Sequence, residues 1–436
     1  MNILFISLGC DKNLVDTEVM LGMLASRGYQ MVEEETQADV IVINTCCFVH
    51  DAKEESIQNI LEMAEYKKEG RLKALIVTGC LAQRYRQEIL DEIPEVDAVL
   101  GTTAYDKILD AIDEALKGHH TLTLADTDLL PEVETKRLVT TGGHFAYLKI
   151  AEGCNKRCTY CVIPSVRGNY RSIPMESLVR EAKKLVENGA KELILVAQET
   201  TVYGIDLYGE KMLPELLRKL CTIEGLVWIR LLYCYPEEIY DELIQTMAES
   251  KKICHHLHLP LQSGSSRVLK EMNRRYDKEK YLQLVDKIRE AIPDISLTTD
   301  IMVGFPGETE EDFQETLDVV RKANYDTAFT FIYSKRSGTP AAGMENQVPE
   351  DVVKDRFSRL LSLVQEKGRE NSSRFQGSVQ EILVEDENRE KGTLTGRTQH
   401  NLLVHFPGEK DLIGKYVKVS LDTCKGFYYF GHIVEE

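Results

Sequence analysis

Three cysteines lie close together in the segment EGCNKRCTYCVIP, which spans residues 152–164. They are Cys154, Cys158 and Cys161, and no further cysteine follows before Cys221. Thiolates are common protein ligands of zinc and of iron-sulfur clusters, and such sites usually have four protein ligands. The C-x3-C-x2-C loop therefore predicts a four-iron, four-sulfur cluster with three protein ligands. Its fourth iron would stay open to a small molecule.

Other chemistries remain for this loop. A zinc site would need a distant ligand, for which His144 is the nearest candidate, whereas zinc-binding cysteines usually come as C-x2-C with a second pair or two histidines. A ferredoxin-like electron carrier would need a fourth cysteine at a set spacing. Unligated thiols are the third reading. A zinc-dependent nucleic-acid-binding module and a non-enzymatic electron carrier thus remain alternative functions.

A second set of cysteines ends three apolar, β-rich runs in residues 1–120. The runs NILFISLGC, ADVIVINTC and KALIVTGC end at Cys10, Cys46 and Cys80, with helical patterns between them. Apolar strands that alternate with helices predict a doubly wound parallel sheet, and ligands bind at the carboxyl ends of its strands. Chain topology can therefore gather these three cysteines. In the doublet with Cys47, we predict Cys46 as the ligand because it directly follows the strand, and Cys47 as a packed thiol.

The rest of the chain separates into three regions by pattern. Residues 121–141 are polar and poor in strands, which predicts a linker. In residues 142–372, six candidate strands alternate with helical segments, which predicts a partial (β/α)6 barrel with its site at the carboxyl ends of the strands. Residues 373–436 have short strands with turn residues, typical of a small antiparallel β-barrel. The predicted fold class is therefore α/β, with three domains.

Composition limits the partners and the compartment. The 436 residues include 53 Lys or Arg and 71 Asp or Glu, which gives a net charge of −18. Such a surface repels phosphate backbones and attracts basic partners. No apolar run approaches the roughly 20 residues of a membrane span, and no Lys or Arg precedes the first run as in a signal peptide. We predict a cytoplasmic protein without membrane association, whose eleven cysteines are reduced or ligate metal.

The loop GCNKRCTYC resembles the signature of the radical S-adenosylmethionine (SAM) enzymes. In that superfamily SAM binds the open iron, and reduction of the cluster cleaves it to a 5′-deoxyadenosyl radical. With the amino-terminal LGC, NTC and TGC and a TRAM-like terminal barrel, nearly the whole chain resembles the methylthiotransferases. The resemblance implies SAM and two 4Fe-4S clusters as cofactors, the second cluster supplying or carrying the sulfur. It implies that the SAM cluster is held by Cys154, Cys158 and Cys161, and the auxiliary cluster by Cys10, Cys46 and Cys80.

The family divides by substrate. One branch modifies an adenosine next to the anticodon of transfer RNA, and the RimO branch modifies the β-carbon of an aspartate in small-subunit ribosomal protein number twelve. The segments VAQETTVYGIDLYG, RLLYCYP and IAEGC resemble the RimO branch, with Glu199 where aspartate is expected. We predict that the chain modifies the ribosomal protein, with the transfer-RNA enzyme as the alternative. The resemblance implies that one SAM methylates sulfur and a second gives the radical that removes a hydrogen from the aspartate.

Charge gives a separate argument about the partner. Residues 373–436 contain eight Lys or Arg and ten carboxylates, so this barrel has aromatic residues but no basic surplus with which to hold RNA. An acidic enzyme suits a basic ribosomal protein. Direct nucleic-acid binding is therefore not expected as the main role. We also expect an electron donor such as flavodoxin or ferredoxin.

Further side chains fall at the predicted strand ends. Tyr160 occupies the aromatic position that lies beside the SAM adenine in the superfamily. Polar groups or glycines that permit close backbone approach follow the second, fourth and fifth barrel strands. We predict cofactor contacts by Tyr160, Gln198, Glu199, Gln262 and Gly304. A substrate contact is predicted for Arg336, which can pair with a carboxylate, and no catalytic residue is predicted beyond the clusters.

Overall fold

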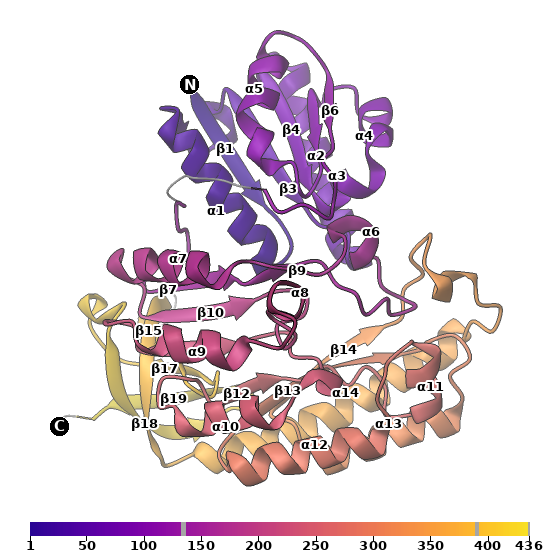
Figure 1. The fold of residues 1–436 in the computed structure, drawn as a ribbon, viewed down its shortest axis with the longest axis vertical. Coiled ribbons are helices and arrows are strands. Elements are labelled where there is room, and N and C mark those ends of the chain that lie inside the picture. The colour runs from indigo at the N-terminus through magenta and orange to yellow at the C-terminus, as the bar shows by residue number, and fades with distance from the viewer. Residues whose placement is uncertain (132–136, 389–391, 435–436) are drawn as a thin grey trace. The chain divides into compact units, whose positions relative to one another are not determined.

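The structure is a computed structural model that describes residues 1–131, 137–388 and 392–434 (Figure 1). It contains two compact units. The first comprises Met1–Thr140, Ala151–Arg157 and Cys161–Ser172, and the second comprises Thr141–Ile150, Cys158–Tyr160 and Ile173–Glu436. These units and the predicted domains divide the chain differently, so the boundaries at 120, 141 and 372 stay predictions. Within the described residues, no helix has the length and apolar character needed to cross a membrane.

The first unit is built on a six-stranded parallel sheet in the order β2-β1-β3-β4-β5-β6. Its strands are β1 (Asn2–Ser7), β2 (Gln30–Met31), β3 (Val40–Thr45), β4 (Ala74–Gly79), β5 (Ala98–Leu100) and β6 (Thr121–Thr123). Its helices are α1 (Asp11–Ser26), α2 (His50–Lys68), α3 (Cys80–Tyr85), α4 (Gln87–Glu92), α5 (Ile108–Leu116) and α6 (Ile163–Arg167). A short antiparallel pair, β8 (Ala151–Glu152) and β9 (Arg171–Ser172), belongs to the same unit.

The two faces of this sheet are both buried. In β3, Ile41 and Ile43 point into one core, and Val40 and Val42 point into the other, because successive side chains of a strand face opposite sides. Helices α2, α3, α4 and α6 contribute to the first core, and α1 and α5 contribute to the second. The prediction of a parallel sheet covered on both faces is therefore confirmed.

The predicted linker contains a strand. Strand β6 pairs with β5 as the last strand of the sheet, although its three residues are too few to show an apolar pattern in the sequence. Farther along, Glu18 of α1 binds residues in the segment 137–140. Its carboxylate accepts the backbone N–H of Thr140 at 2.7 Å and the Nε–H of Arg137 at 2.8 Å. Up to Thr140, the described residues of this polar stretch therefore belong to the first unit.

The second unit contains an open barrel of six parallel strands. They are β7 (Phe145–Lys149), β10 (Glu192–Val196), β11 (Trp228–Leu231), β12 (His256–His258), β13 (Ser296–Val303) and β14 (Thr327–Ile332). The helices of this unit are α7 (Met175–Glu187), α8 (Ile205–Tyr208), α9 (Leu213–Cys221), α10 (Asp241–Glu249), α11 (Ser266–Glu271), α12 (Lys278–Ala291), α13 (Glu310–Ala323) and α14 (Glu350–Ser372). The six predicted strands are all present.

The barrel strands form two three-stranded sheets, β11-β10-β7 and β12-β13-β14. Backbone hydrogen bonds join the two sheets, because the N–H of Ile229 donates to the carbonyl of Lys252 at 2.7 Å and the N–H of Cys254 donates to that of Ile229 at 2.8 Å. The spatial order of the strands therefore follows their order along the chain. This arrangement confirms the predicted partial (β/α)6 barrel.

The last part of the chain forms a closed five-stranded barrel in the order β15-β16-β17-β19-β18. Its strands are β15 (Val379–Asn388), β16 (Thr393–Thr398), β17 (Leu403–Phe406), β18 (Tyr416–Cys424) and β19 (Tyr428–Ile433). The neighbours are antiparallel except β17 and β19, which are parallel because the chain crosses over to β18 between them. The predicted small barrel is confirmed, with this one parallel pair.

The small barrel covers the amino ends of the larger barrel's strands (Figure 1). Arg230 of β11 donates to the backbone carbonyls of Thr398 and Gln399 at 3.1 and 3.0 Å, and its Nε pairs with Glu192, the first residue of β10, at 2.6 Å. A small core containing Trp228 lies beside this buried ion pair. Because the larger barrel's site is expected at the carboxyl ends, the small barrel lies at the opposite end.

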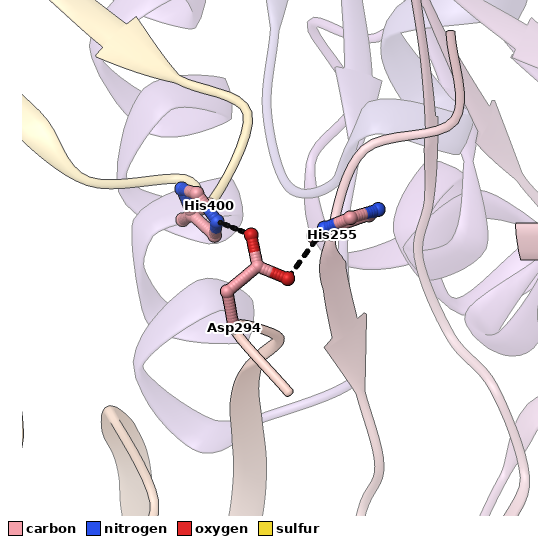
Figure 2. A group of neighbouring side chains, drawn as sticks. All are labelled: His255, Asp294 and His400. Atoms are coloured by element: carbon pink, nitrogen blue, oxygen red, sulfur yellow. Dashed lines mark hydrogen bonds and ion pairs between the residues drawn. The ribbon is translucent and has the colours of Figure 1, made fainter. Parts of the chain in front are cut away.

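One carboxylate ties the small barrel to two parts of the larger one (Figure 2). Asp294, which precedes β13, accepts a hydrogen bond from His400 Nε2 of the small barrel at 3.0 Å and another from His255 Nδ1 at 2.7 Å. Hydrogen bonding to His400 and the charge of both imidazoles lower the pKa of Asp294. Each carboxylate oxygen of Asp294 already has a donor, so these three side chains join the small barrel to the larger one.

We expect Asp312 to stabilise the second unit. Burial acts to raise the pKa of this carboxyl, but hydrogen bonds from Arg267, Ser265 and Thr309 lower it to about 2. Asp312→Ala should lower the free energy of unfolding by about 1–2 kcal/mol, since water screens the half-exposed Arg267. The loss should be equal at pH 5.5 and pH 8, because the carboxyl is ionised in the folded and unfolded chains at both. The stabilisation itself would disappear only below about pH 4, as the pH falls toward the folded pKa.

Urea unfolding at the two pH values measures this loss. The control is Asp318→Ala on the same helix, α13, because Asp318 forms an exposed ion pair with Arg321. It should change stability by less than about 0.5 kcal/mol. Equal losses for the two variants would contradict the role assigned to Asp312.

Candidate active site

The three amino-terminal cysteines follow neighbouring strands of the first unit. Cys10 lies three residues beyond β1 and caps the start of α1, Cys46 directly follows β3, and Cys80 directly follows β4 as the first residue of α3. Because β1, β3 and β4 are adjacent and parallel, all three cysteines lie at the carboxyl edge of the sheet. Cys10 is half-buried, and Cys46 and Cys80 are buried.

Glycines make room for this cysteine edge. Gly9 has a φ of +92°, and a Cβ there would lie 2.7 Å from the Cβ of Cys46. Gly79 has a φ of +93°, and a Cβ there would lie 2.8 Å from the backbone N of Thr45. L-residues with side chains rarely adopt this backbone conformation. The two glycines therefore let the loops after β1 and β4 approach the loop after β3.

Two buried asparagines fix the same loops. The Asn13 side-chain amide donates to the carbonyls of Leu8 at 3.0 Å and Thr45 at 2.9 Å. The Asn44 amide donates to the carbonyl of Asn13 at 2.9 Å and to Thr17 Oγ1 at 3.0 Å. These bonds link the β1 loop, the β3 loop and α1. The sheet edge that carries Cys10, Cys46 and Cys80 is thus held in place by hydrogen bonds within the protein.

The chemistry of these thiols fits a metal group. Burial raises the pKa of Cys46, and it raises the pKa of Cys80 to about 12 although the Arg167 guanidinium acts to lower it. None of the eleven cysteines forms a disulfide. Buried thiols with a raised pKa hold their protons at neutral pH, whereas a bound metal replaces the proton and stabilises the thiolate. Three thiols at one sheet edge, two of them buried, therefore suit a cluster better than a nucleophile.

Cys47 has a different environment. It belongs to the hydrophobic core between the sheet and its helices, and its Sγ donates to the carbonyl of Cys80 at 3.3 Å. Burial raises its pKa to about 11. The side chain thus has the contacts of a packed thiol, and its exclusion from the ligand set stays a prediction.

Sequence reasoning missed Arg167, which lies beside the amino-terminal cysteines. Its side chain is buried at the end of α6, and its Nε–H donates to the Sγ of Cys80 at 3.4 Å. Arginine in a polar loop is usually exposed, so nothing in the sequence segment VRGNYR distinguished it. The structure thereby adds a positive charge to the candidate cluster site.

The C-x3-C-x2-C loop follows β8. The backbone N–H of Cys154 donates to the carbonyl of Gly168 at 3.1 Å, and the Sγ of Cys161 accepts the N–H of Ile163 at 3.4 Å. Arg157 has a φ of +51°, an uncommon conformation for a residue with a side chain. Such conformations persist where the surroundings enforce them, and they are frequent at functional sites. Backbone N–H groups thus donate hydrogen bonds on both sides of Cys158, one of them to the sulfur of Cys161.

Cys158 belongs to the second unit. Its Sγ lies 3.9 Å from the hydroxyl of Tyr235 and accepts from Arg274 Nη1 at 3.7 Å. The Arg274 guanidinium is buried, and it stacks 4.3 Å from the ring centre of Tyr235 and donates to the carbonyl of Pro260 at 3.0 Å. Arg274 was also missed from the sequence. Each group of cysteines therefore has one cysteine sulfur that accepts from a buried guanidinium.

The predicted adenine neighbour and the predicted substrate residue contact each other. Tyr160 is 6% exposed, and its ring meets Phe305 edge-on at a centroid distance of 6.5 Å. Arg336 Nη1 donates to the backbone carbonyl of Tyr160 at 2.8 Å. The structure thus gives Arg336 a role in holding the loop, and its substrate contact stays a prediction.

The residues after β10 lie at the expected carboxyl end. Glu199 is buried, and its Oε1 accepts the backbone N–H of Thr201 at 2.9 Å. Gln198 precedes it and is half-buried. A carboxylate held by a backbone N–H can also accept from an amino group, such as that of SAM. The structure places both side chains at the correct end of the barrel, and their cofactor contacts stay predictions.

Gln262 and Gly304 lie after β12 and β13. Gln262 has a φ of +65°, and its backbone N–H and carbonyl bond to Asp300 and Met302, each at 2.8 Å. At Gly304 a Cβ would lie 2.6 Å from Cγ2 of Val353. Packing against α14 is therefore enough to require glycine there. The predicted ligand approach at Gly304 is not needed to explain the residue, and it stays a prediction.

The distant zinc ligand considered from the sequence lies at the other end of the barrel. His144 precedes the amino end of β7, whereas Cys158 belongs to the loop beyond its carboxyl end. A Cβ added at Gly414 of the small barrel would lie 3.4 Å from the Cβ of His144. Burial lowers the pKa of His144. The position of His144 therefore disfavours a zinc site completed by this histidine.

Comparisons with known proteins agree with this organisation. Residues 2–101 match the uncharacterized protein family UPF0004, residues 148–320 match the Radical SAM superfamily, and residues 373–434 match the TRAM domain. Among solved structures, the radical SAM methyltransferase TsrM from Kitasatospora setae, with cobalamin and a 4Fe-4S cluster bound, has a TM-score of 0.56. The alignment covers 78% of this chain and 74% of TsrM at 12% identity, which shows similarity of fold alone.

Full-length relatives are much closer in sequence. Ribosomal protein uS12 methylthiotransferase RimO of Lachnoclostridium phytofermentans is 53% identical over 438 residues, which cover 99% of both chains. The protein of the same name from Clostridioides difficile is 43% identical over 436 residues, or 99% of this chain and 98% of its own. The transfer-RNA branch is not favoured by these relatives. The chain belongs to the RimO family of radical SAM methylthiotransferases.

Proposed function

We propose that this chain methylthiolates the β-carbon of an aspartate in ribosomal protein uS12. The observation that carries the proposal is the delivery of Cys10, Cys46 and Cys80 to one edge of the sheet by three adjacent strands. A radical SAM enzyme needs only the C-x3-C-x2-C loop to cleave SAM. A second set of three cysteines in the same chain is what sulfur insertion requires.

The two sets of cysteines would hold different cofactors. Cys154, Cys158 and Cys161 would hold the cluster that binds SAM, and Cys10, Cys46 and Cys80 would hold the auxiliary cluster. When bound, the clusters supply the one-electron chemistry that amino-acid side chains lack, and the auxiliary cluster supplies or carries the sulfur. The thiols must lose their protons as the clusters bind, so loading is favoured by higher pH.

The side chains of the protein would position and shield the reactants. The aspartate β-carbon is unactivated, so ordinary general-base chemistry at neutral pH cannot remove its hydrogen. Tyr160 and Phe305 provide apolar surface beside the loop, and Glu199 provides a carboxylate for the SAM amino group. Such surroundings exclude water and fix the reacting atoms close together, which prevents quenching of a radical.

Charge supports a basic protein as the partner. The chain has a net charge of −18, and electrostatic attraction increases the rate at which oppositely charged proteins associate. The small barrel lies at the amino ends of the larger barrel's strands, whereas the loop with Cys158 follows the carboxyl end of β7. We therefore assign the small barrel no part in the chemistry. The electron donor and the cytoplasmic location stay predictions.

A direct comparison of substrates tests the proposed function. Anaerobically reconstituted full-length enzyme is given SAM, dithionite and either purified uS12 or an anticodon stem-loop RNA. We expect mass spectrometry to find one methylthio group on a uS12 aspartate, and at least a hundredfold less modification on the RNA. Substitution of that aspartate by asparagine in uS12 should remove the product. Modification of the RNA alone would contradict the proposed substrate.

A further inference from the structure

The guanidinium of Arg167 makes four hydrogen bonds beside the amino-terminal cysteines. Its Nε–H donates to the Sγ of Cys80 at 3.4 Å, and Nη1 donates to Asp16 at 2.7 Å and to Glu152 at 3.1 Å. Nη2 donates to the side-chain carbonyl of Asn13, the residue that also holds the β1 and β3 loops. Arg167 is 2% exposed. All three guanidinium nitrogens of Arg167 thus donate hydrogen bonds within the first unit.

Neutralising carboxylates does not by itself explain this arrangement. Asp16 and Glu152 are both 3% exposed, and both accept from the same nitrogen of Arg167, Nη1. The Nε–H instead points at a sulfur that we propose as a cluster ligand. Removing a guanidinium from water carries a penalty of several kcal/mol, so such a group needs strong negative partners. A thiolate ligand at Cys80 would be such a partner.

The core of the first unit, rather than a ligand, fixes the position of Arg167. The preceding residue, Val166, is buried in the core that contains Cys80, and its carbonyl accepts from the hydroxyl of Thr102 at 2.6 Å. Helix α6 is thereby anchored, and it begins two residues after Cys161. A donor held in advance can stabilise charge without reorganising.

We propose that Arg167 is a positioning residue that raises the reduction potential of the auxiliary cluster, through its N–H bond to Cys80 and its fixed positive charge. The inference rests on the proposed function, because it takes Cys10, Cys46 and Cys80 as the ligands. One-electron reduction adds a negative charge to the cluster. A nearby cation and a hydrogen bond to a ligand sulfur stabilise that added charge, so they favour the reduced state.

The sign and size of the effect follow from this stabilisation. Replacing Arg167 by a neutral residue should disfavour reduction by at least tenfold in the equilibrium constant. For a one-electron couple this is a shift of about 59 mV to more negative potential. Lysine keeps the charge but loses the planar fork, so its shift should have the same sign and be smaller. If Arg167 only linked α1 to β8 through Asp16 and Glu152, its replacement would lower the stability of the protein but leave the reduction potential of the cluster unchanged.

The test isolates the auxiliary cluster in the full-length chain. Cys154, Cys158 and Cys161 are replaced by alanine, and Arg167→Gln and Arg167→Lys are made in that background. The control is Arg356→Gln, because Arg356 is a buried arginine of the second unit that pairs with Glu308 at 2.8 Å and has a role in neither group of cysteines. Reductive titration with dithionite, followed by electron paramagnetic resonance, gives each midpoint potential together with the iron content.

The midpoint potentials of the three variants decide whether Arg167 acts on the cluster. The inference predicts a potential lowered by at least about 59 mV in Arg167→Gln, a smaller shift of the same sign in Arg167→Lys, and a change of less than twofold in the equilibrium constant for Arg356→Gln. An unchanged potential in Arg167→Gln, or an equal shift in Arg356→Gln, would overturn it. If Arg167→Gln holds no iron, Arg167→Lys decides in the same way. Absence of iron from the background variant with Arg167 intact would instead contradict the proposed function.

Discussion

Replacement of Cys158 by alanine should reduce the cleavage of SAM to 5′-deoxyadenosine by more than about 100-fold, because loss of even an outer partner of a metal ligand costs 10–100-fold. The variant should keep about four irons, since it leaves Cys10, Cys46 and Cys80 unaltered at the carboxyl edge of the sheet in the first unit. Methylthiolation of uS12 should fall equally, because no radical forms. Liquid chromatography of 5′-deoxyadenosine and an iron assay measure both effects.

The control is another thiol of the second unit, to which Cys158 also belongs. Cys234 is buried in the barrel, with its Sγ 3.5 Å from Thr200 Oγ1, and burial raises its pKa to about 12. Cys234→Ala removes another buried thiol without altering the C-x3-C-x2-C loop. It should keep SAM cleavage within about threefold and lower stability by roughly 1 kcal/mol. Unchanged cleavage in Cys158→Ala would exclude the loop from SAM chemistry.

The cysteine doublet gives the second large effect. Cys46→Ala should remove the auxiliary cluster and reduce methylthiolation to background, while SAM cleavage continues within about threefold. Cys47→Ala should retain both activities, because its Sγ lies in the core and donates to the carbonyl of Cys80. The pair differs by one position in the sequence, so expression and burial are closely matched. The readouts are iron content, 5′-deoxyadenosine and methylthiolated uS12.

The opposite pattern would change the ligand assignment. If Cys47→Ala lost the cluster and Cys46→Ala kept it, the loop after β3 would have to turn so that the second cysteine faces the other two. The thiol of Cys47 would then have to leave the hydrophobic core. Loss of SAM cleavage in Cys46→Ala would show that the two groups of cysteines do not act independently.

The sequence was sufficient for the parts of the fold that have strong periodicity. β3 and β4 are runs of six buried residues, so their apolar pattern predicted a sheet covered on both faces and placed Cys46 and Cys80 at its edge. The six barrel strands were also predicted. Strand β6 was not, because its three residues are held by backbone pairing at the edge of the sheet. Periodicity carries no information about such a strand.

The charged groups around the cysteines could not be predicted from the sequence. Arg167 and Arg274 become buried only because α6 and the segment after α11 fold against the cysteine loops. The close parallel packing of the β1, β3 and β4 loops likewise depends on Gly9 and Gly79, whose conformations are visible only in three dimensions. For Gly304, packing against Val353 already requires glycine, so the residue type by itself could not show whether a ligand approaches there, and that contact stays a prediction.

Whether the chain holds two clusters is decided by the iron and sulfide content of the anaerobically reconstituted full-length protein, together with its Mössbauer spectrum. We expect about eight irons and eight sulfides per chain, with the spectrum of two 4Fe-4S clusters. The variant without Cys10, Cys46 and Cys80 should keep about half of each. About four irons in the unaltered chain, or zinc in place of iron, would rule out two clusters.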